Sequence, residues 1–325
     1  MRALVVGGAG YIGSVTVDQL LQSGHTVTVL DNLVSGHRDA VNHDAELVVG
    51  DVRDEDSLAR LMASHSFDAV IYYAGYIQAG ESVLNPGRYF ANNVGGCIAL
   101  LSSMVAYGVG RFVFSSSAAV YGEPESVPVT EEAPVRPVNP YGESKDMVER
   151  MLPWHERQSD MRYISLRYFN AAGATDSRGE DHRPESHLIP IVLQTAAGQR
   201  EFVPLFGTDY ATADGTCIRD YVHVSDLAAA HILALERLET GSGVYNLGSG
   251  SGFSNRELIE TARTVTGKPI TVREEPRRPG DPARLVASNE KAKRDLGWRP
   301  AVASLEAIIE SAWRWHQAHP KGYAS

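Results

Sequence analysis

A short apolar strand, a glycine-rich turn and a helix open this chain, and together they constrain its fold more than any other feature. Residues 3–6 are apolar and stop at the turn Gly7-Gly8-Ala9-Gly10-Tyr11-Ile12-Gly13. Residues 12–23 have helical spacing and end at Gly24. Glycines let a backbone approach a pyrophosphate closely, and a helix N-terminus supplies amide donors and partial positive charge. We therefore predict a dinucleotide-binding turn, with an ordinary tight turn as the alternative.

The pattern of this first unit repeats along the first half of the chain. Further buried strands are predicted at residues 26–30, 46–49, 69–73, 112–115 and 163–168. Helical spacing falls between them, in a helix that ends near residue 64, in residues 86–107 and in residues 141–156, where Pro153 is expected to kink or end the helix. Strands that alternate with helices across short loops favour an α/β fold with a doubly wound parallel sheet of the Rossmann type.

The composition of the sequence changes after about residue 170. Glycine, proline and charged residues become more frequent there, and strands no longer alternate regularly with helices. We predict an NAD-binding domain of residues 1–170 plus about 218–250. A smaller α/β substrate domain is predicted from about 171–217 plus 251–325. Residues 218–238 and 245–247 are expected to return to the sheet, so the boundary is discontinuous.

The carboxyl ends of the predicted strands carry the residues that choose the cofactor. Asp31 follows the second strand, where a carboxylate accepts hydrogen bonds from both ribose hydroxyls and repels a 2′-phosphate. This favours NAD over NADP, although Asp31 has an alternative role as a turn or capping residue. Asp51-Val52 after the third strand and Tyr73-Ala74-Gly75 after the fourth lie on the same expected ligand side.

A tyrosine and a lysine four residues apart form the predicted catalytic pair, in Tyr141-Gly142-Glu143-Ser144-Lys145. On a helix these two side chains share one face. A free tyrosine titrates near pH 10, and the Lys145 ammonium together with a nicotinamide cation is expected to lower that pKa toward neutrality. Ser117 ends the fifth strand and offers a second hydroxyl to a substrate alcohol. The three residues predict hydride transfer at a secondary alcohol. The alternative is that Tyr141 and Lys145 are an exposed i,i+4 pair on a surface helix.

Composition excludes several other classes. The net charge of -10 disfavours nucleic acid as a partner. The two cysteines, Cys97 and Cys217, suit a reducing cytoplasm better than a disulfide scaffold. The apolar stretch 3–17 is broken by glycines and too short to span a membrane, so no membrane association is expected.

Several further motifs give the chain a resemblance that covers nearly its whole length. It resembles the extended short-chain dehydrogenase/reductase superfamily and, within it, the UDP-glucose 4-epimerases (UDP-galactose 4-epimerases). Besides the segments above, the resemblance rests on Gly80-Glu81-Ser82-Val83, Asn92-Asn93-Val94, Phe114-Ser115-Ser116-Ser117-Ala118-Ala119-Val120-Tyr121-Gly122, Leu166-Arg167-Tyr168-Phe169-Asn170, Asp214-Gly215-Thr216-Cys217-Ile218-Arg219-Asp220-Tyr221-Val222-His223-Val224, Tyr245-Asn246-Leu247-Gly248 and Arg277-Arg278-Pro279-Gly280-Asp281.

The resemblance implies a mechanism and a set of contacts. NAD stays bound, and Tyr141 takes the proton of the sugar 4-hydroxyl while a hydride moves from C4 to NAD. The 4-keto sugar then rotates about its link to the diphosphate and takes the hydride back on its other face. Ser117 is the hydroxyl partner, and Lys145 polarises Tyr141. The implied cofactor contacts are Gly7, Gly10, Tyr11, Ile12, Gly13, Asp31, Asn32, Asp51, Val52, Tyr73, Ala74, Gly75, Asn92, Tyr141, Lys145 and Tyr168. The implied UDP-sugar contacts are Ser117, Tyr141, Asn170, His187, Leu188, Phe206, Arg219, Tyr221, Arg278 and Asp281.

Two positions depart from the family pattern. Tyr76-Ile77-Gln78 has no lysine where many members place one against the cofactor, so Gln78 is a candidate replacement. His187 stands where many members have asparagine, and we interpret it as a substitute polar contact to the diphosphate. The histidines show no spacing such as H-E-x-x-H, and no metal is predicted. Arg219 and Arg278 have surface ion pairs with Asp220 or Asp281 as an alternative.

Four other functions are alternatives, and the first is an epimerase that acts on another nucleotide sugar. A nucleotide-sugar 4,6-dehydratase shares the fold and the tyrosine-lysine pair, but its family places an Asp-Glu pair after the strand-end hydroxyl, where this chain has Ala118-Ala119. The same alanines disfavour a uronate decarboxylase. A non-catalytic NAD-binding regulator typically lacks the pair that Tyr141 and Lys145 form.

The resemblance also implies an assembly and a substrate preference. Family members form homodimers through two long helices, here around residues 93–107 and 141–154. The bulk of Leu285 is expected to crowd a sugar 2-N-acetyl group, which favours UDP-glucose and UDP-galactose over UDP-N-acetylhexosamines.

Overall fold

A parallel seven-stranded sheet forms the centre of the computed structural model, which describes residues 1–278 and 280–324. The strands stand in the order β11-β6-β5-β4-β1-β2-β3, and every pairing between them is parallel. Their bounds are β1 Arg2–Val6, β2 Thr26–Asp31, β3 Glu46–Val49, β4 Ala69–Tyr72, β5 Arg111–Ser117, β6 Arg162–Tyr168 and β11 Gly243–Leu247. The predicted α/β class and doubly wound sheet are confirmed.

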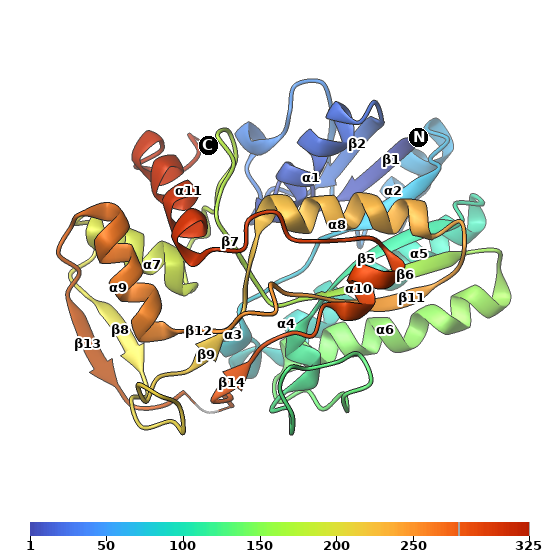
Figure 1. Cartoon of the computed structure of the whole chain (residues 1–325). Helices are drawn as coiled ribbons and strands as arrows, with labels where there is room; N and C mark the ends of the chain where they lie inside the picture. The colour runs from blue at the N-terminus through green and yellow to red at the C-terminus, as the bar shows by residue number, and fades with distance from the viewer. Residues whose placement is uncertain (279, 325) are drawn as a thin grey trace.

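Both faces of the sheet carry apolar side chains that face a core. In β1, Ala3 and Val5 face one core while Leu4 and Val6 face the other. One core is closed by α1 (Tyr11–Gln22) and α8 (Val224–Arg237), which runs across the front of the sheet in Figure 1. The other is closed by α2 (Glu55–Ser64), α5 (Gly96–Ala106) and α6 (Pro140–Gln158).

The strand order reverses between β1 and β4, and this point decides where a ligand fits. Successive connections leave β1 and β4 in opposite directions along the sheet, which opens a crevice beyond their carboxyl ends. The glycine turn after β1 and the loop after β4 border this crevice. Sequence elements far apart in the chain are thereby brought to one edge.

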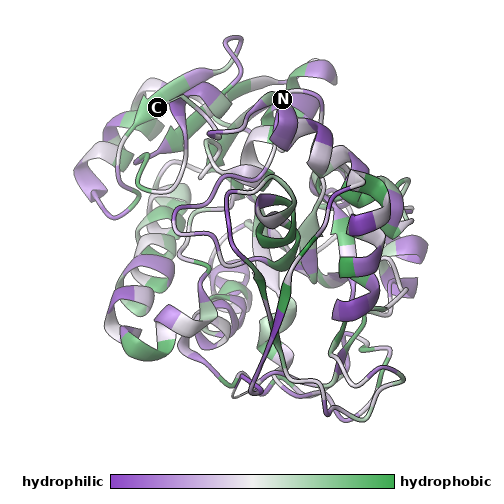
Figure 2. Ribbon diagram, turned by 90° about the vertical axis from the view of Figure 1, so that its left-hand side faces the viewer, coloured by the Kyte–Doolittle hydropathy of each residue, from purple (hydrophilic) through white to green (hydrophobic). Residues whose placement is uncertain are grey.

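A second lobe packs beside the sheet, on the left of Figure 1. Its own apolar core lies between α7 (Leu188–Ala196), α9 (Asn255–Thr266) and α11 (Leu305–Ala318). In Figure 2 this lobe faces the viewer, and its outer helices alternate between hydrophilic and hydrophobic residues. The remaining elements are η1 Arg38–Ala40, α3 Ala79–Leu84, α4 Pro86–Tyr89, η2 Phe90–Gly95, η3 Ala118–Tyr121, β7 Asn170–Ala172, β8 Val203–Phe206, β9 Ile218–Arg219, β10 Tyr221–His223, β12 Phe253–Ser254, β13 Val272–Glu275, β14 Arg284–Leu285 and α10 Glu290–Asp295.

Three local expectations need correction. Pro153 does not end α6, which continues to Gln158. The helix predicted at residues 86–107 contains a π-helical segment, η2, between α4 and α5. Within the expected return to the sheet, only β11 joins the seven strands, whereas β9 and β10 pair in small separate sheets.

One continuous helical run, Pro86–Ala106, is long and apolar enough to cross a membrane. However, 56% of its most apolar window is buried inside the protein, as in a core helix of a soluble fold. It is therefore weak support for a membrane span.

Candidate functional site

The glycine turn has a shape that only glycine permits at two of its positions. Gly7 has a φ of 81°, and a Cβ on it would lie 2.6 Å from the backbone nitrogen of Ala74. A Cβ on Gly13 would lie 2.4 Å from the carbonyl oxygen of Gly7. The turn therefore sits directly against the end of β4 and against the first turn of α1.

Asp31 closes this turn from the end of β2. Its Oδ2 accepts a hydrogen bond of 3.0 Å from the backbone N–H of Ala9, and its Oδ1 accepts one of 2.9 Å from that of Leu33. Burial raises the pKa of Asp31, while these two backbone donors partly offset the rise. The carboxylate is fixed at the mouth of the crevice, within reach of a ligand there.

A cavity of about 630 Å³ extends from the turn along the carboxyl ends of the strands. We call it the strand-end cavity. The predicted site residues that line the cavity are spread along the chain from residue 7 to residue 187. They are Gly7, Gly10, Tyr11, Ile12, Gly13, Asp31, Asn32, Val52, Tyr73, Ala74, Gly75, Asn92, Ser117, Tyr141, Tyr168, Asn170 and His187.

The lining of the cavity suits a dinucleotide. Within 4 Å, a Cβ on Gly10 would meet only the carbonyl oxygen of Gly7, at 3.4 Å, so the open side of Gly10 faces the cavity beside the N-terminus of α1. That end offers amide donors to a pyrophosphate, and Asp31 offers a carboxylate to a ribose. These residues fit NAD.

Ser117 and Tyr141 both line the cavity, and the Ser117 hydroxyl is close enough to the Tyr141 phenol to lower its pKa. Ser117 is the last residue of β5, and its Oγ also accepts from the backbone N–H of Ala119. Tyr141 stands in the first turn of α6, which Asn139 caps by accepting from Gly142 N–H. A Cβ on Gly142 would lie 2.5 Å from the Ala119 carbonyl oxygen, so glycine here lets the two hydroxyl-bearing elements approach.

Lys145 lies one turn along α6 and is only 3% exposed. Its Nζ donates a hydrogen bond of 2.7 Å to the carbonyl oxygen of Ser115 and lies 5.9 Å from the centre of the Tyr141 ring. Burial lowers the pKa of Lys145 to about 8. The lysine is thus held by the strand that ends in Ser117.

Two effects within the protein shift the pKa of Tyr141. Burial raises this pKa, and the interaction with Ser117 lowers it only in part. The predicted lowering toward neutrality depends on a nicotinamide cation as well as on Lys145, and it stays a prediction.

A buried ion pair beneath these residues was missed in the sequence. Glu149, one turn beyond Lys145, binds Arg167 of β6 at 2.5 Å, and the two side chains are 6% and 7% exposed. Glu149 Oε1 also accepts from the Ser116 hydroxyl. The pair joins α6 to β5 and β6, which holds Tyr141 and Lys145 over the strand ends. Only its burial distinguishes it from a surface pair, and burial is not visible in the spacing.

Asn93 is a second residue that the predicted contacts omitted. Its Oδ1 accepts from Tyr76 N–H, and its Nδ2 donates to the Tyr76 carbonyl and to Ser144 Oγ. It ties the loop after β4 to the catalytic helix. Its neighbour Asn92 lines the cavity.

Asp51 and Lys145 are the two predicted cofactor contacts outside the cavity lining. Asp51 binds Arg53 at 2.7 Å and accepts from Asn32 Nδ2, and these donors hold the pKa of its carboxyl well below its usual range. Its neighbour Val52 reaches the cavity instead.

Four predicted substrate residues, Phe206, Arg219, Arg278 and Asp281, lie outside the cavity lining and form two contacting pairs. Arg219 forms an ion pair of 3.3 Å with Asp281, and the Arg278 guanidinium lies 3.8 Å from the centre of the Phe206 ring. We call these four residues the arginine group. The ion-pair alternative holds for Arg219 with Asp281; Asp220 is buried and accepts from Ser249 instead.

Tyr221 and Leu188 complete the predicted substrate set, and Pro279 lies outside the described residues. Tyr221 is buried in β10, which pairs with the β7 strand of Asn170. Leu188 begins α7 and packs against the core of the second lobe.

The two departures from the family pattern both line the strand-end cavity. Gln78 Nε2 donates to the carbonyl oxygen of Pro184, and both residues line the cavity with His187. Burial lowers the pKa of His187, but Glu180 and Glu185 outweigh this and raise it to about 10.

Comparisons with known proteins agree with this geometry. The NAD dependent epimerase/dehydratase family matches residues 3–248. The UDP-glucose 4-epimerase of Halalkalibacterium halodurans is 53% identical over 329 residues, covering 100% of this chain and 98% of that protein. A crystal structure of a UDP-glucose 4-epimerase superposes with a TM-score of 0.98 at 49% identity and full coverage of both chains. The crystal structure of the Brucella ovis UDP-glucose 4-epimerase in complex with NAD superposes with a TM-score of 0.93 at 43% identity. The match covers 96% of this chain and 97% of that one.

Proposed function

Since this chain belongs to the NAD dependent epimerase/dehydratase family, we propose that it interconverts UDP-glucose and UDP-galactose by transient oxidation at sugar C4. It is an isomerase with NAD as cofactor. The observation that carries the proposal is that Ser117 and Tyr141 both line a cavity that begins at the glycine turn.

The strand-end cavity has the groups to hold NAD along its length. The N-terminus of α1 at Tyr11 and Ile12 would hold the pyrophosphate, and Asp31 would accept hydrogen bonds from the adenosine ribose. Val52 and Tyr73-Ala74-Gly75 border the path between the two ends. When bound, NAD supplies the hydride acceptor and donor for the sugar C4.

Tyr141 is the proton acceptor and donor. Its phenol oxygen takes the proton of the C4 hydroxyl as oxidation proceeds and gives it back as the ketone is reduced. Ser117 shares that proton, because its hydroxyl is close enough to the phenol to lower the pKa of Tyr141. Lys145 fixes the orientation of the Tyr141 helix through its bond to the Ser115 carbonyl and adds positive charge beside the phenolate.

The residues after Ser117 argue against a dehydratase. Ala118 and Ala119 follow Ser117 in η3, and neither carries a group that can remove a C5 proton or protonate a C6 hydroxyl. The acid and base that a dehydratase needs at these two positions are therefore missing, which favours return of the hydride to C4.

A coupled assay tests the proposal. Protein loaded with NAD is given UDP-galactose, and formation of UDP-glucose is followed. Turnover is expected without a net change in NAD. Folded, NAD-loaded protein that forms no UDP-glucose contradicts the epimerase function and favours the non-catalytic regulator.

We propose that the substrate lies between the cavity and the arginine group. Asn170 and His187 supply polar contacts from the cavity wall. Arg219 and Arg278 suit a diphosphate because a guanidinium makes paired, charge-assisted hydrogen bonds with phosphate oxygens. The division into an NAD-binding domain of residues 1–170 plus about 218–250 and a nucleotide-sugar domain of the remainder is part of this proposal.

Leu285 is proposed to set the sugar preference. It lies on β14, opposite Arg219 of β9 in the pairing register. Its bulk disfavours a 2-N-acetyl group, so Leu285→Ala is expected to raise the activity on UDP-GlcNAc relative to UDP-galactose by roughly tenfold. An equal catalytic efficiency of the unaltered protein on both sugars contradicts this role.

We further propose a cytoplasmic homodimer. Ile98 and Val105 on α5 and Trp154 on α6 are exposed apolar side chains, as a helix-mediated interface requires. Light scattering is expected to give twice the 35.3 kDa chain mass. A monomer mass excludes the dimer.

A further inference from the structure

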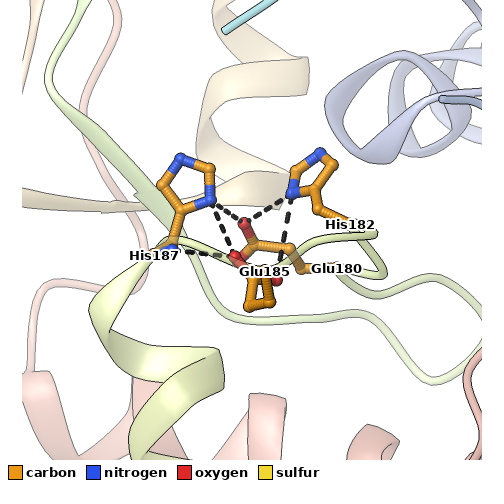
Figure 3. Close-up of side chains that lie close together, drawn as sticks. All are labelled: Glu180, His182, Glu185 and His187. Atoms are coloured by element: carbon orange, nitrogen blue, oxygen red, sulfur yellow. Dashed lines mark hydrogen bonds and ion pairs between the residues drawn. The ribbon is translucent and has the colours of Figure 1, made fainter. Parts of the chain in front are cut away.

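Four potential metal ligands converge in the connection between β7 and α7. Glu180, His182, Glu185 and His187 each direct one nitrogen or oxygen atom to a common point, and these four atoms all lie within 4.8 Å of one another. Figure 3 shows the two imidazoles facing each other across the two carboxylates. The cluster is separate from Ser117, Tyr141 and Lys145, and the proposed reaction uses only His187 from it.

The donor atoms are near enough to share one metal ion. His187 Nδ1 lies 2.7 Å from Glu180 Oε1, and His182 Nδ1 lies 3.1 Å from Glu180 Oε1 and 4.0 Å from Glu185 Oε2. Ligands about 2.0–2.2 Å from a tetrahedral metal are about 3.3–3.6 Å apart. Shifts of roughly half an ångström bring these atoms to that spacing.

His187 Nδ1 is held at the centre of the cluster by two carboxylates. It is buried and lies 2.7 Å from Glu180 Oε1 and 3.2 Å from Glu185 Oε1, although neither contact has the geometry of a hydrogen bond. A metal ion would take the place of the proton that this ion pair holds on the nitrogen.

The chemistry of the four ligands selects the ion. Two imidazole nitrogens and two carboxylates suit a transition metal better than Mg²⁺ or Ca²⁺, which prefer oxygen-only shells. Two carboxylates also balance a divalent charge. We propose that Glu180, His182, Glu185 and His187 form a closed, four-ligand Zn²⁺ site, contrary to the expectation from H-E-x-x-H spacing.

The surroundings orient the ligands. Glu185 Oε1 accepts from the backbone N–H groups of Ser186 and His187, at 2.7 and 2.8 Å. These bonds leave its Oε2 for the cluster. Glu180 and Glu185 side chains are 9% and 5% exposed, whereas that of His187 is 41% exposed toward the cavity it lines. Four protein ligands leave no open position, so the ion stabilises the cavity wall rather than activating a substrate.

Metal binding is measured directly and does not depend on the proposed reaction. Protein prepared without an affinity tag is stripped with a chelator, dialysed and titrated with Zn²⁺, with metal content read by mass spectrometry. One Zn²⁺ per chain is expected. Zn²⁺ is also expected to raise the melting temperature of the stripped protein by about 4 °C, the shift for a chain of this size at roughly one hundred times the Kd.

Two variants and a matched control decide where the ion sits. His182→Ala and Glu180→Gln are each expected to lose the bound Zn²⁺ and the thermal shift. His65→Ala removes a histidine that contacts Glu46 at 2.9 Å, far from the cluster in the sequence, and is expected to retain both. His182 is the less buried of the two targets, so its variant remains informative if Glu180→Gln does not fold.

Absence of stoichiometric Zn²⁺ in the unaltered, folded protein overturns the site, and the cluster is then an ion-pair network centred on a protonated His187. Retention of Zn²⁺ by folded His182→Ala also overturns it. Co²⁺ substitution gives a further readout, because a tetrahedral site of this composition is expected to give visible absorption that His182→Ala lacks.

Discussion

The strand-end cavity and the arginine group hold their polar residues in different ways. Around the cavity, Asp31, Lys145 and Ser117 are buried and bound to backbone groups of the glycine turn, of β5 and of the residues just after β5. In the arginine group, Arg219 pairs with Asp281, whose side chain is 37% exposed, and Arg278 lies over the Phe206 ring. Arg219 also donates to the carbonyl oxygens of Ile218 and Pro282. The cavity is therefore arranged before a ligand binds, whereas Arg219 has to exchange the Asp281 carboxylate for a diphosphate.

The largest effect is expected from the chemistry of the cavity itself. Tyr141→Phe removes the proton-transferring hydroxyl without changing the volume of the ring, and kcat is expected to fall by about 10²–10⁴. The NAD content of the purified protein is expected to remain, since the glycine turn and Asp31 are untouched. Both are measured on one preparation, by the coupled assay and by absorbance after denaturation. Near-normal turnover excludes Tyr141 as the proton carrier.

A glycine pair tests how rigid the cavity edge is. Gly7 and Gly24 both have positive φ, at 81° and 78°, but a Cβ on Gly24 meets nothing within 4 Å. Gly24→Ala is expected to cost about 1 kcal/mol of unfolding free energy from backbone strain alone. Gly7→Ala also forces the turn away from Ala74, at a cost of roughly 3 kcal/mol, and should lose bound NAD. Denaturant unfolding and NAD content decide the matter, and equal effects of the two substitutions contradict a preformed turn.

The buried polar groups behind the cavity make the fold sensitive to acid. His231 of α8 is bonded to Ser115 Oγ at 3.0 Å, and burial lowers its pKa to about 4. The folded state therefore binds fewer protons than the unfolded state between pH 6.5 and 4. Stability attributable to this group is complete above pH 6.5 and falls as the pH drops to 4, by on the order of 3 kcal/mol.

Unfolding at several pH values measures this loss. His231→Asn is expected to flatten the pH dependence in that window, whereas His43→Asn, at an exposed position, should leave it unchanged. An unaltered slope in His231→Asn shows that other groups cause the acid sensitivity.

The arginine group should affect substrate binding alone. Arg278→Ala is expected to raise KM for UDP-galactose about 10- to 100-fold, the value of a charge-assisted hydrogen bond, with NAD content unchanged. Arg273 provides a matched control, because its guanidinium also lies 3.8 Å from a phenylalanine ring, that of Phe202. Arg273→Ala should leave KM unchanged. A loss of NAD in Arg278→Ala, or the same KM shift in both variants, removes the distinction between the two regions.

Most of the sheet and the cofactor were predictable from the sequence because they depend on local signals. Apolar runs, glycines and the position of Asp31 after a strand each constrain neighbours within about thirty residues. The parallel sheet, the family and NAD are confirmed. The roles of the site residues remain predictions.

What escaped prediction depends on contacts between distant segments. In the sequence, Glu149 and Arg167 resemble ordinary surface charges, and their burial follows only from the packing of α6 against β6. The raised pKa of Tyr141 follows from burial, which the spacing to Lys145 does not reveal. Glu180, His182, Glu185 and His187 lie close in sequence, but only the fold of their loop brings the four donor atoms together.

Transfer of the C4 hydrogen within the protein is the central claim, and one isotope experiment tests it directly. NAD-loaded protein converts UDP-galactose in D₂O with no added cofactor, and the hydrogen at C4 of the UDP-glucose product is examined by mass spectrometry and NMR. The account predicts conversion with the original C4 hydrogen retained and no deuterium at that carbon. Deuterium at C4, or no conversion by folded protein that contains NAD, contradicts it.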